Sequence, residues 1–283
     1  MRIIPTDATV GATVEDLDVR TIDAATWPAI YQAWLQFAVL IFPRQHLDDG
    51  EHMAFTLRFG PLERSMAVKR PGARLDFTRL ANIDDAGVVV SDPEARITRS
   101  LVGNQEWHSD SSFKPIGAKA SVLRAITVPR KGGQTEFADM RAAYDALDVD
   151  TRQRLEPMTA IHSFAGTGYI TEEESRHLSP VSHRVVSTHD ETGRRSLFIG
   201  RHALAIDGLP DREARALLET LREAACRRPR TYAHGWAEGD VVVWDNRCVL
   251  HRGRPWDMRE PRVMRRLTVA GAGPENPWLF TES

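Results

Sequence analysis

The spacing of apolar residues along the chain predicts two kinds of element. Segments in which apolar residues repeat every three or four positions are expected to be helices with one buried face. These helices are expected at 23–37, from Asp48 or Asp49 to Gly60-Pro61, from Asp139 through Leu147, and at 211–227. Short apolar runs between turn residues are typical of strands. Strands are expected at 39–42, 120–128, 134–137, 195–199, 240–244, 248–252 and 263–270.

The order of these elements predicts the fold class. No helix separates the last three expected strands, so the alternating strand–helix pattern of a parallel sheet does not fit. Groups of strands with helices at the start and between the groups are typical of a double-sheet jelly roll. The chain is therefore expected to be mainly β with helical additions around a jelly-roll core, the cupin-like double-stranded β-helix. All 283 residues are expected to form one domain.

Composition narrows the classes of function. The net charge is −2, with no basic excess, which argues against nucleic-acid binding. No apolar run has the length of a membrane span, and the first residues lack the apolar stretch of a signal peptide. Two cysteines cannot form a disulfide framework. We expect a soluble cytoplasmic protein with a small-molecule substrate and no membrane or nucleic-acid partner, and a homo-oligomer is left open.

The first candidate for chemistry is the pair His108 and Asp110. Two residues apart on a strand, both side chains would point to the same face and could bind one metal ion. Taken alone the pair means little, because the chain contains a second one, His46 and Asp48. There Asp48 is better explained as the cap of the expected helix.

The C-terminal part of the chain adds a third candidate ligand, a second histidine. The run Trp-Asp-Asn-Arg-Cys-Val-Leu-His over 244–251 places His251 one strand after a tight turn, and Arg262 and Arg266 follow it. Two histidines and one carboxylate form a donor set that can hold one metal ion and leave further coordination positions open.

Together with the block Gly132-Gly133-Gln134-Thr135, these motifs give the chain a family resemblance. From about Gly11 to Ala270 it resembles the taurine dioxygenase and 2,4-D dioxygenase family of Fe(II)/2-oxoglutarate-dependent oxygenases. Within the family it is most similar to the phenoxypropionate (dichlorprop) dioxygenases. No single motif is specific, but their combination is.

The resemblance implies a set of site residues. The Fe(II) ligands would be His108, Asp110 and His251, and 2-oxoglutarate and O2 would fill the open positions. Arg262 and Thr135 would bind the far carboxylate of 2-oxoglutarate, and Arg266 either its near end or an acid group of the substrate. Asn104 matches a family position beside the substrate. Arg265 would point to the opposite face of its strand. Because halogenating relatives lack the carboxylate of Asp110, its presence favours hydroxylation.

The resemblance also suggests a substrate. We expect hydroxylation of a small organic acid, with cleavage of an aryloxyalkanoate ether and release of succinate and CO2. The candidates for the apolar wall of its site are Met66, Val68 and Phe113. The alternative is an alkyl sulfate, a sulfonate or an amino-acid-derived substrate. Taurine itself is not expected, because Ser65 and Val68 replace the residues with which taurine enzymes hold it.

Two long stretches are expected to cover the site. Residues 63–106 contain turn-forming pairs around short strand-like runs such as 87–90, and 166–182 form a polar loop. Connections of this length in a compact domain are usually functional or disordered. We expect 63–103 and 166–182 to act as lid segments that close over bound substrate.

Two other interpretations fit the same residues less well. A zinc hydrolase would also use two histidines and a carboxylate, but it gives no reason for Thr135 and the two spaced arginines. A jelly-roll binding module without metal would leave the intact ligand set unexplained. Core packing explains Trp107, Trp244 and Cys248 equally well, and His162, His183, His189, His202 and His234 are expected to be structural or exposed.

Overall fold

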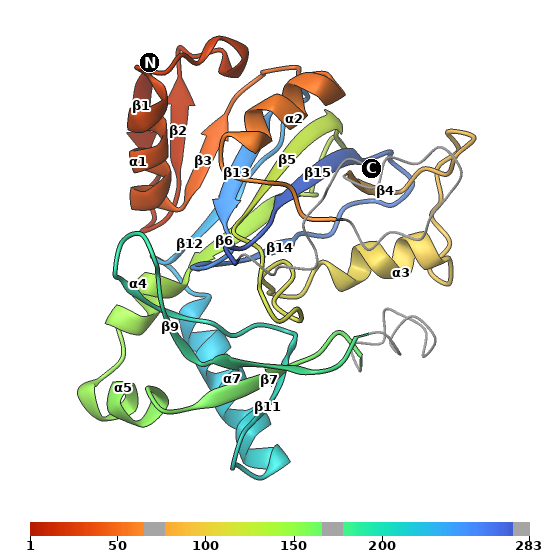
Figure 1. Cartoon of the computed structure of the whole chain (residues 1–283). Coiled ribbons are helices and arrows are strands. Elements are labelled where there is room, and N and C mark those ends of the chain that lie inside the picture. The colour runs from red at the N-terminus through yellow and green to blue at the C-terminus, as the bar shows by residue number, and fades with distance from the viewer. Residues whose placement is uncertain (65–76, 166–177, 274–283) are drawn as a thin grey trace.

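A large, mostly antiparallel sheet forms the upper part of the molecule (Figure 1). The computed structural model describes residues 1–64, 77–165 and 178–273. The sheet has the order β1 (Arg2–Pro5), β2 (Ala12–Glu15), β3 (Val39–Phe42), β13 (Val241–Asp245), β5 (Ala120–Thr127), β15 (Val263–Val269) and β4 (Thr78–Ala81). Among the described strands of this sheet, β2 and β3 form the one parallel pair.

A smaller antiparallel sheet packs against one face of the large one. It has the order β12 (Thr231–His234), β6 (Thr135–Asp139) and β14 (Val249–Gly253). Phe137 and Val249 of the small sheet share one hydrophobic cluster with Leu123, Val242 and Met264 of the large sheet. This two-layer packing of sheets confirms the predicted β-rich, jelly-roll-type core.

Helices cover the other face of the large sheet. The first is α1 (Trp27–Phe37) and the second is α2 (Asp49–Leu57), which begins with a capping box between Asp48 and Glu51. They pack on Val241 and Val243 of β13. Since side chains alternate along a strand, Val242 and Trp244 point the other way, into the space between the two sheets.

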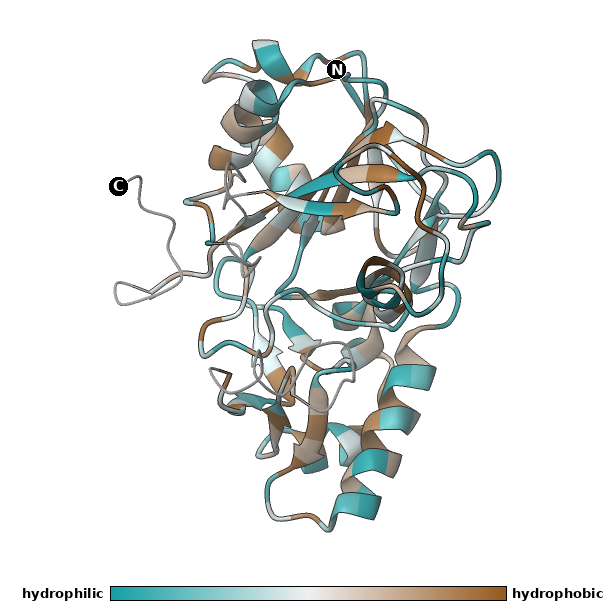
Figure 2. Ribbon diagram, turned by 90° about the vertical axis from the view of Figure 1, so that its right-hand side faces the viewer, coloured by the Kyte–Doolittle hydropathy of each residue, from teal (hydrophilic) through white to brown (hydrophobic). Residues whose placement is uncertain are grey.

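A second group of elements forms the lower part of the molecule in Figure 1. It contains α4 (Met140–Asp145), α5 (Val149–Leu155), α7 (Asp211–Ala225), β7 (Thr159–His162), β8 (Val181–Arg184), β9 (Val186–Thr188), β10 (Arg195–Leu197) and β11 (Ala203–Ile206). Leu218 and Leu221 of α7 are buried against Leu250 and other residues of the same cluster. In Figure 2, hydrophilic residues lie on the outward side of this long helix.

Most predicted elements are present, with ends that differ by a few residues. The helix expected at 23–37 begins at Trp27, and the one expected at 211–227 ends at Ala225. The prediction that 63–106 lacks regular structure was wrong for two described parts, β4 and the helix α3 (Arg96–Gly103). The strand-like run 87–90 contributes only an isolated bridge between Ile83 and Val89.

The elements that the sequence did not predict are short. β1, β2, β7, β8, β9, β11 and β12 have three or four residues each, too few for an alternating pattern to stand out. The short helices α5 and η1 (Val19–Thr21) were missed for the same reason. In the described part of the chain, no helix has both the length and the apolar character needed to cross a bilayer.

Candidate metal centre

The three candidate ligands meet in the space between the two sheets. His251 lies on β14, and its backbone exchanges two hydrogen bonds with that of His108, with N···O distances of 2.8 and 3.0 Å. The expected strand at 108–110 is reduced to this one bridge, and a turn begins at Asp110, where Ser111 adopts a positive φ of 57°. The ligand atoms of the three side chains lie within 4.8 Å of one another.

The orientation of the two imidazoles suits a shared ion. His108 Nε2 lies 3.9 Å from Asp110 Oδ1, and His251 Nε2 lies 3.6 Å from Asp110 Oδ2. His108 Nδ1 donates to the carbonyl of Glu106 at 2.7 Å, which leaves its Nε2 lone pair for a metal. His251 Nδ1 is buried without a hydrogen-bond partner in the described part of the chain.

The surroundings keep each ligand in the protonation state that metal binding needs. Burial, with the nearby His251, holds the pKa of His108 well below its ordinary value, and burial lowers the pKa of His251 to about 4. Burial alone would raise the pKa of Asp110, but the guanidinium of Arg266 and the other donors around it outweigh burial and lower it. Two neutral imidazoles and an ionised carboxylate are therefore present at neutral pH.

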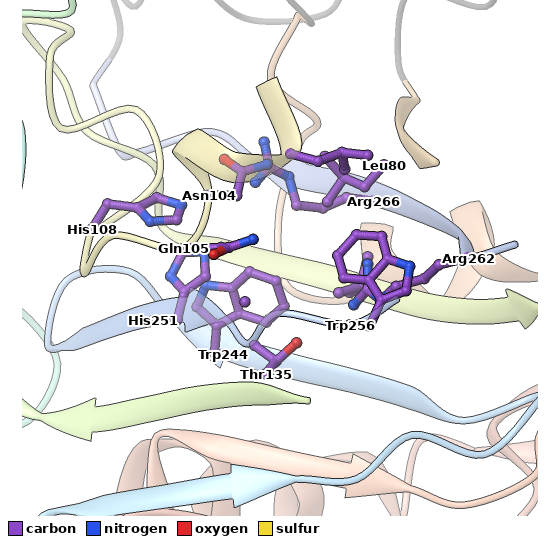
Figure 3. Close-up of a pocket in the computed structure, with 13 residues that line it drawn as sticks. Leu80, Asn104, Gln105, His108, Thr135, Trp244, His251, Trp256, Arg262 and Arg266 are labelled. Atoms are coloured by element: carbon purple, nitrogen blue, oxygen red, sulfur yellow. The ribbon is translucent and has the colours of Figure 1, made fainter. Parts of the chain in front are cut away.

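A pocket opens next to these ligands (Figure 3). Its lining includes two ligands and both spaced arginines: Leu80, Leu101, Asn104, Gln105, His108, Leu123, Thr135, Trp244, His251, Gly253, Trp256, Arg262 and Arg266. The register explains how they meet. Thr135 pairs with Gly253 and Phe137 pairs with His251. Residues directly opposite each other, or two apart on one strand, lie on the same face, so all four positions share one face of the small sheet.

Arg262 places a charge at the far end of this pocket from the histidines, as Figure 3 shows. It is 6% exposed, and its guanidinium donates from Nη2 to the carbonyl of Gly133 at 3.2 Å. The indole of Trp256 lies 5.1 Å from the guanidinium, while Nε is buried without a partner within the described residues. Burial lowers the pKa of Arg262 to about 10, so the group is still charged at neutral pH.

The two glycines of the Gly132-Gly133 block leave room for this arrangement. Both have positive φ, 80° and 68°, which residues with a Cβ rarely adopt. A Cβ on Gly133 would lie 3.2 Å from Arg262 Nε, and one on Gly132 would lie 2.5 Å from the carbonyl oxygen of Pro255. Thr135 then follows on β6, where its hydroxyl accepts a hydrogen bond from Trp236 Nε1 at 3.0 Å.

Arg266 reaches from β15 to the ligand set. Its Nη1 donates to Asp110 Oδ1 at 2.5 Å, and its Nε is buried without a partner among the described residues. Met264 on the same strand faces the inner core, so Arg266, two residues on, faces it as well. Arg265 points to the other side and pairs with Asp49, as the alternation predicted.

Of the residues expected beside the substrate, the structure places one in the pocket lining and one outside it. Asn104 lines the pocket, and its carbonyl accepts from the backbone N–H of Gly253 at 2.8 Å. Phe113 is not among the lining residues; its ring packs on His202 at 5.1 Å and on Phe164 at 4.7 Å. Met66 and Val68 lie outside the described residues.

The expected lid segments are only partly described. Residues 65–76 and 166–177 lie outside the described part of the chain. Of the remainder, β4 contributes Leu80 to the pocket lining, and α3 contributes Leu101. These two apolar side chains come from the segment that the sequence assigned to a cover.

Several residues near the site were not singled out by sequence reasoning. Gln105 and Trp256 line the pocket. His202, expected to be structural or exposed, is 2% exposed, and its ring centroid lies 6.2 Å from that of His108. Asn246, interpreted as a turn residue, hydrogen-bonds around Asp110. Of these residues, Asn246 lies within the motif at 244–251, which could have singled it out, and Gln105, Trp256 and His202 had no distinctive signal.

A second buried group, His189, Asp245 and Cys248, also has three ligand types close together. Its carboxylate is already engaged: Asp245 accepts from His189 Nε2 at 2.9 Å and from both Nε and Nη2 of Arg247. Burial holds the pKa of the Cys248 thiol well above its ordinary value, so the thiol is protonated. This arrangement is that of a structural ion pair, and Cys248 is the small core residue that the sequence predicted.

The fold and the site agree with the relationships of the sequence. The model of the family described as "Taurine catabolism dioxygenase TauD, TfdA family" matches residues 2–268, and the chain belongs to this family. It is therefore an oxidoreductase, an α-ketoglutarate-dependent dioxygenase (α-ketoglutarate is 2-oxoglutarate). The zinc hydrolase and the metal-free binding module are set aside.

Particular relatives narrow the comparison. The chain is 44% identical to an (S)-phenoxypropionate/alpha-ketoglutarate-dioxygenase of Sphingobium herbicidovorans, over 95% of this chain and 94% of the relative. It is 40% identical to the alpha-ketoglutarate-dependent 2,4-dichlorophenoxyacetate dioxygenase of Cupriavidus pinatubonensis, over 91% and 93%. Among solved structures, AAD-2 in complex with Mn(II) and N-oxalylglycine superposes with a TM-score of 0.87 at 38% identity, covering 96% of this chain and 99% of that one.

Proposed function

We propose that this protein is an Fe(II)- and 2-oxoglutarate-dependent dioxygenase that cleaves the ether of an aryloxyalkanoate by hydroxylating it. The observation that carries the proposal is the pocket itself, which holds a buried guanidinium, Arg262, at the opposite end from two neutral imidazoles. A dicarboxylate that chelates a metal at one end needs a fixed cation at the other. The names of the relatives described above favour an aryloxyalkanoate over a sulfate, a sulfonate or an amino acid.

The proposed Fe(II) ligands are His108, Asp110 and His251. Two imidazole nitrogens and one carboxylate oxygen on one side of an ion form the donor set of non-haem iron oxygenases, and their protonation states fit. With iron bound, the centre would supply the oxidation of 2-oxoglutarate by O2, to succinate and CO2, coupled to hydroxylation of the substrate.

Arg262 and Thr135 are the proposed partners of the far carboxylate of 2-oxoglutarate. The guanidinium can offer two parallel N–H donors, which match the geometry of a carboxylate, and its Nε has no other partner in the described part of the chain. The hydroxyl of Thr135 accepts from Trp236, so its own proton is available to a carboxylate oxygen.

Arg266 is the proposed anchor for the acid group of the substrate. Only its Nη1 is committed to Asp110, and the buried Nε leaves a donor for a second acid. Asn104 would lie beside the bound molecule, and Leu80 and Leu101 would keep water away from its apolar body. The lid role of 63–103 and 166–182, and the apolar wall of Met66 and Val68, belong to the same proposal; Phe113 is left out of it, because its ring packs on His202 and Phe164.

Ether cleavage follows from hydroxylation alone. A hydroxyl group placed on the carbon that carries the ether oxygen gives a hemiketal or hemiacetal. Its collapse breaks the bond between that carbon and the aryloxy oxygen, forms a carbonyl at the carbon, and transfers the hydroxyl proton to the departing phenolate. The products are a phenol and a keto or aldehyde acid.

The remaining features of the proposal concern the whole protein. Residues 1–283 are proposed to work as one domain, in the cytoplasm, with no nucleic-acid or membrane partner. A homo-oligomer is compatible with it.

A substrate screen tests the proposal. The protein is incubated with Fe(II), 2-oxoglutarate and air, and succinate is measured with each candidate: both enantiomers of 2-phenoxypropionate, phenoxyacetates, alkyl sulfates, sulfonates and amino acids. We expect an aryloxyalkanoate to stimulate succinate formation, with an equal amount of phenol. Stimulation by a sulfate ester or an amino acid alone would refute the substrate. No succinate with any of them would refute the wider proposal.

A further inference from the structure

The turn between β13 and β14 carries an asparagine whose side chain meets the candidate carboxylate ligand. Asn246 is 1% exposed and lies at the start of this turn, far in sequence from Asp110. We propose that Asn246 is a positioning residue for Asp110, acting directly on its backbone and, through Ser121, on its carboxylate. This inference rests on the proposed metal site.

The contacts form a closed network around the ligand. Asn246 Oδ1 accepts from the backbone N–H of Asp110 at 3.1 Å, and Asn246 Nδ2 donates to Ser121 Oγ at 3.0 Å. Ser121 Oγ in turn donates to Asp110 Oδ2 at 2.7 Å. The amide N–H can only donate to the hydroxyl and the ionised carboxylate can only accept from it, so the hydroxyl proton is directed toward the carboxylate. Asn246 therefore holds the main chain of Asp110 directly and its Oδ2 through Ser121, while Arg266 binds the other carboxylate oxygen.

A device of this kind is needed because the backbone does not hold Asp110. The two histidines are fixed by the two hydrogen bonds of their own bridge. Two residues further on the chain is already in a turn, with Ser111 at positive φ, so no strand pairing positions Asp110. The side chain of Asn246 takes the place of the missing strand partner.

The same oxygen also reaches the packing around His251. Trp244 Nε1 donates to Asn246 Oδ1 at 3.0 Å, and the indole of Trp244 lies 4.6 Å from the imidazole of His251. The two donors, an indole N–H and a backbone N–H, fix which way the amide points, since neither can accept. Asn246 thus links the segment that carries Asp110 to the strand that carries His251.

Metal binding tests the proposal without relying on turnover. Co(II) serves as the probe, because its visible spectrum reports the ligand geometry and its dissociation constant can be titrated. Loss of an outer hydrogen-bond partner of a metal ligand typically weakens metal binding by about 10- to 100-fold. We expect Asn246→Ala and Ser121→Ala to show a loss of this size and an altered Co(II) spectrum. Asn246→Asp keeps the acceptor and loses the amide donor, so its effect should be intermediate.

Ser111→Ala is the matched control. Ser111 is the residue next to Asp110, is buried, and donates its hydroxyl to a carboxylate that is not a candidate ligand, Glu63, at 2.6 Å. It should bind Co(II) with the parent affinity and spectrum. Circular dichroism and thermal melts check the fold of every variant. If Asn246→Ala fails to fold, Ser121→Ala and Asn246→Asp still decide the question.

The two proposals fail in different ways. If Asp110→Ala binds Co(II) as the parent does, the metal assignment is wrong. If Asp110→Ala loses Co(II) while folded Asn246→Ala and Ser121→Ala keep the parent affinity and spectrum, the metal site stands and the positioning role of Asn246 is refuted. An equal loss in Ser111→Ala would also refute it, since any buried hydroxyl would then have the same effect.

Discussion

Replacing Arg262 with methionine should have opposite effects on the free protein and on its affinity for 2-oxoglutarate. In the free protein the guanidinium is buried, and no carboxylate of the described residues pairs with it. Methionine is unbranched and apolar like the stem of arginine, reaches about as far as the arginine Nε, and carries no charge. The Arg262→Met protein should therefore be more stable without ligand than the parent, and should bind 2-oxoglutarate far more weakly.

The structure gives the size of both effects. Burial lowers the pKa of Arg262 from 12.5 to about 10. At about 1.36 kcal/mol for each pKa unit, the buried charge costs the free protein about 3 kcal/mol. The hydrogen bond to Gly133 and the contact with Trp256 offset part of this, so a gain of roughly 1–3 kcal/mol in unfolding free energy is expected. A buried pair that loses one partner costs roughly 3–5 kcal/mol, which weakens 2-oxoglutarate binding by roughly two to four orders of magnitude.

Two measurements on the same variant separate these effects. Denaturant titration of the metal-free protein gives the unfolding free energy, and anaerobic calorimetry of the Mn(II)-loaded protein gives the dissociation constant of 2-oxoglutarate. Arg265→Met is the control, because Arg265 lies on β15 but faces the other side and pairs with Asp49. It should leave the 2-oxoglutarate constant unchanged. An Arg262→Met protein that binds 2-oxoglutarate like the parent would refute the assignment.

Three further predictions follow from the site and its surroundings. His251→Ala should abolish Fe(II) binding and turnover, and a variant with the parent metal content would contradict the ligand set. Arg266→Gln should raise the KM of the acid substrate by about 10- to 100-fold, since it removes a charged hydrogen bond; an effect on 2-oxoglutarate binding alone would assign Arg266 to the cosubstrate. Burial lowers the pKa of His162 to about 3. Between about pH 6.5 and 3 the unfolded chain therefore binds a proton that the folded chain does not, and the unfolding free energy decreases as the pH is lowered. His162 should contribute about 2 kcal/mol to the loss at pH 5, and His162→Phe should reduce the loss by that amount in denaturant titrations; an unchanged loss in the variant would exclude a contribution from His162.

Side chains alternate between the two faces of a strand, which explains why much of the fold and the orientation of several site residues could be predicted. The period of two correctly placed Arg265 on the face opposite Arg266, and the structure confirms it through the pairing of Arg265 with Asp49. The apolar runs at 240–244 and 248–252 placed Trp244 and His251 on strands that follow one another. The length of the apolar runs gave β3, β5, β13 and β15 within a residue or two.

Turns and side-chain contacts between distant segments account for what could not be predicted. A period-two pattern was expected through Asp110, but the chain turns there, so Phe113 is carried to a place behind His202 rather than into the pocket lining. His202 itself follows a turn and has no spacing relation to the other histidines. Helix α3 was hidden because it has only eight residues, too few for a clear helical repeat, inside a segment dominated by turn-forming pairs.

The turn between β13 and β14 shows why a short motif was more informative than the strands on either side of it. Three successive residues, Trp244 and Asp245 at the end of β13 and Asn246 in the turn, make different contacts. Trp244 packs on His251, Asp245 binds Arg247 and His189, and Asn246 binds the segment of Asp110. The number of residues between Asn246 and His251 is also fixed. Deleting one residue of β14 would turn His251 away from the inner face while Asn246 stayed in place, because neighbouring strand residues face opposite sides. The same eight residues must satisfy three different contacts and one strand register, which is why the motif can be recognised in the sequence. A strand that only fills the core has no such constraint.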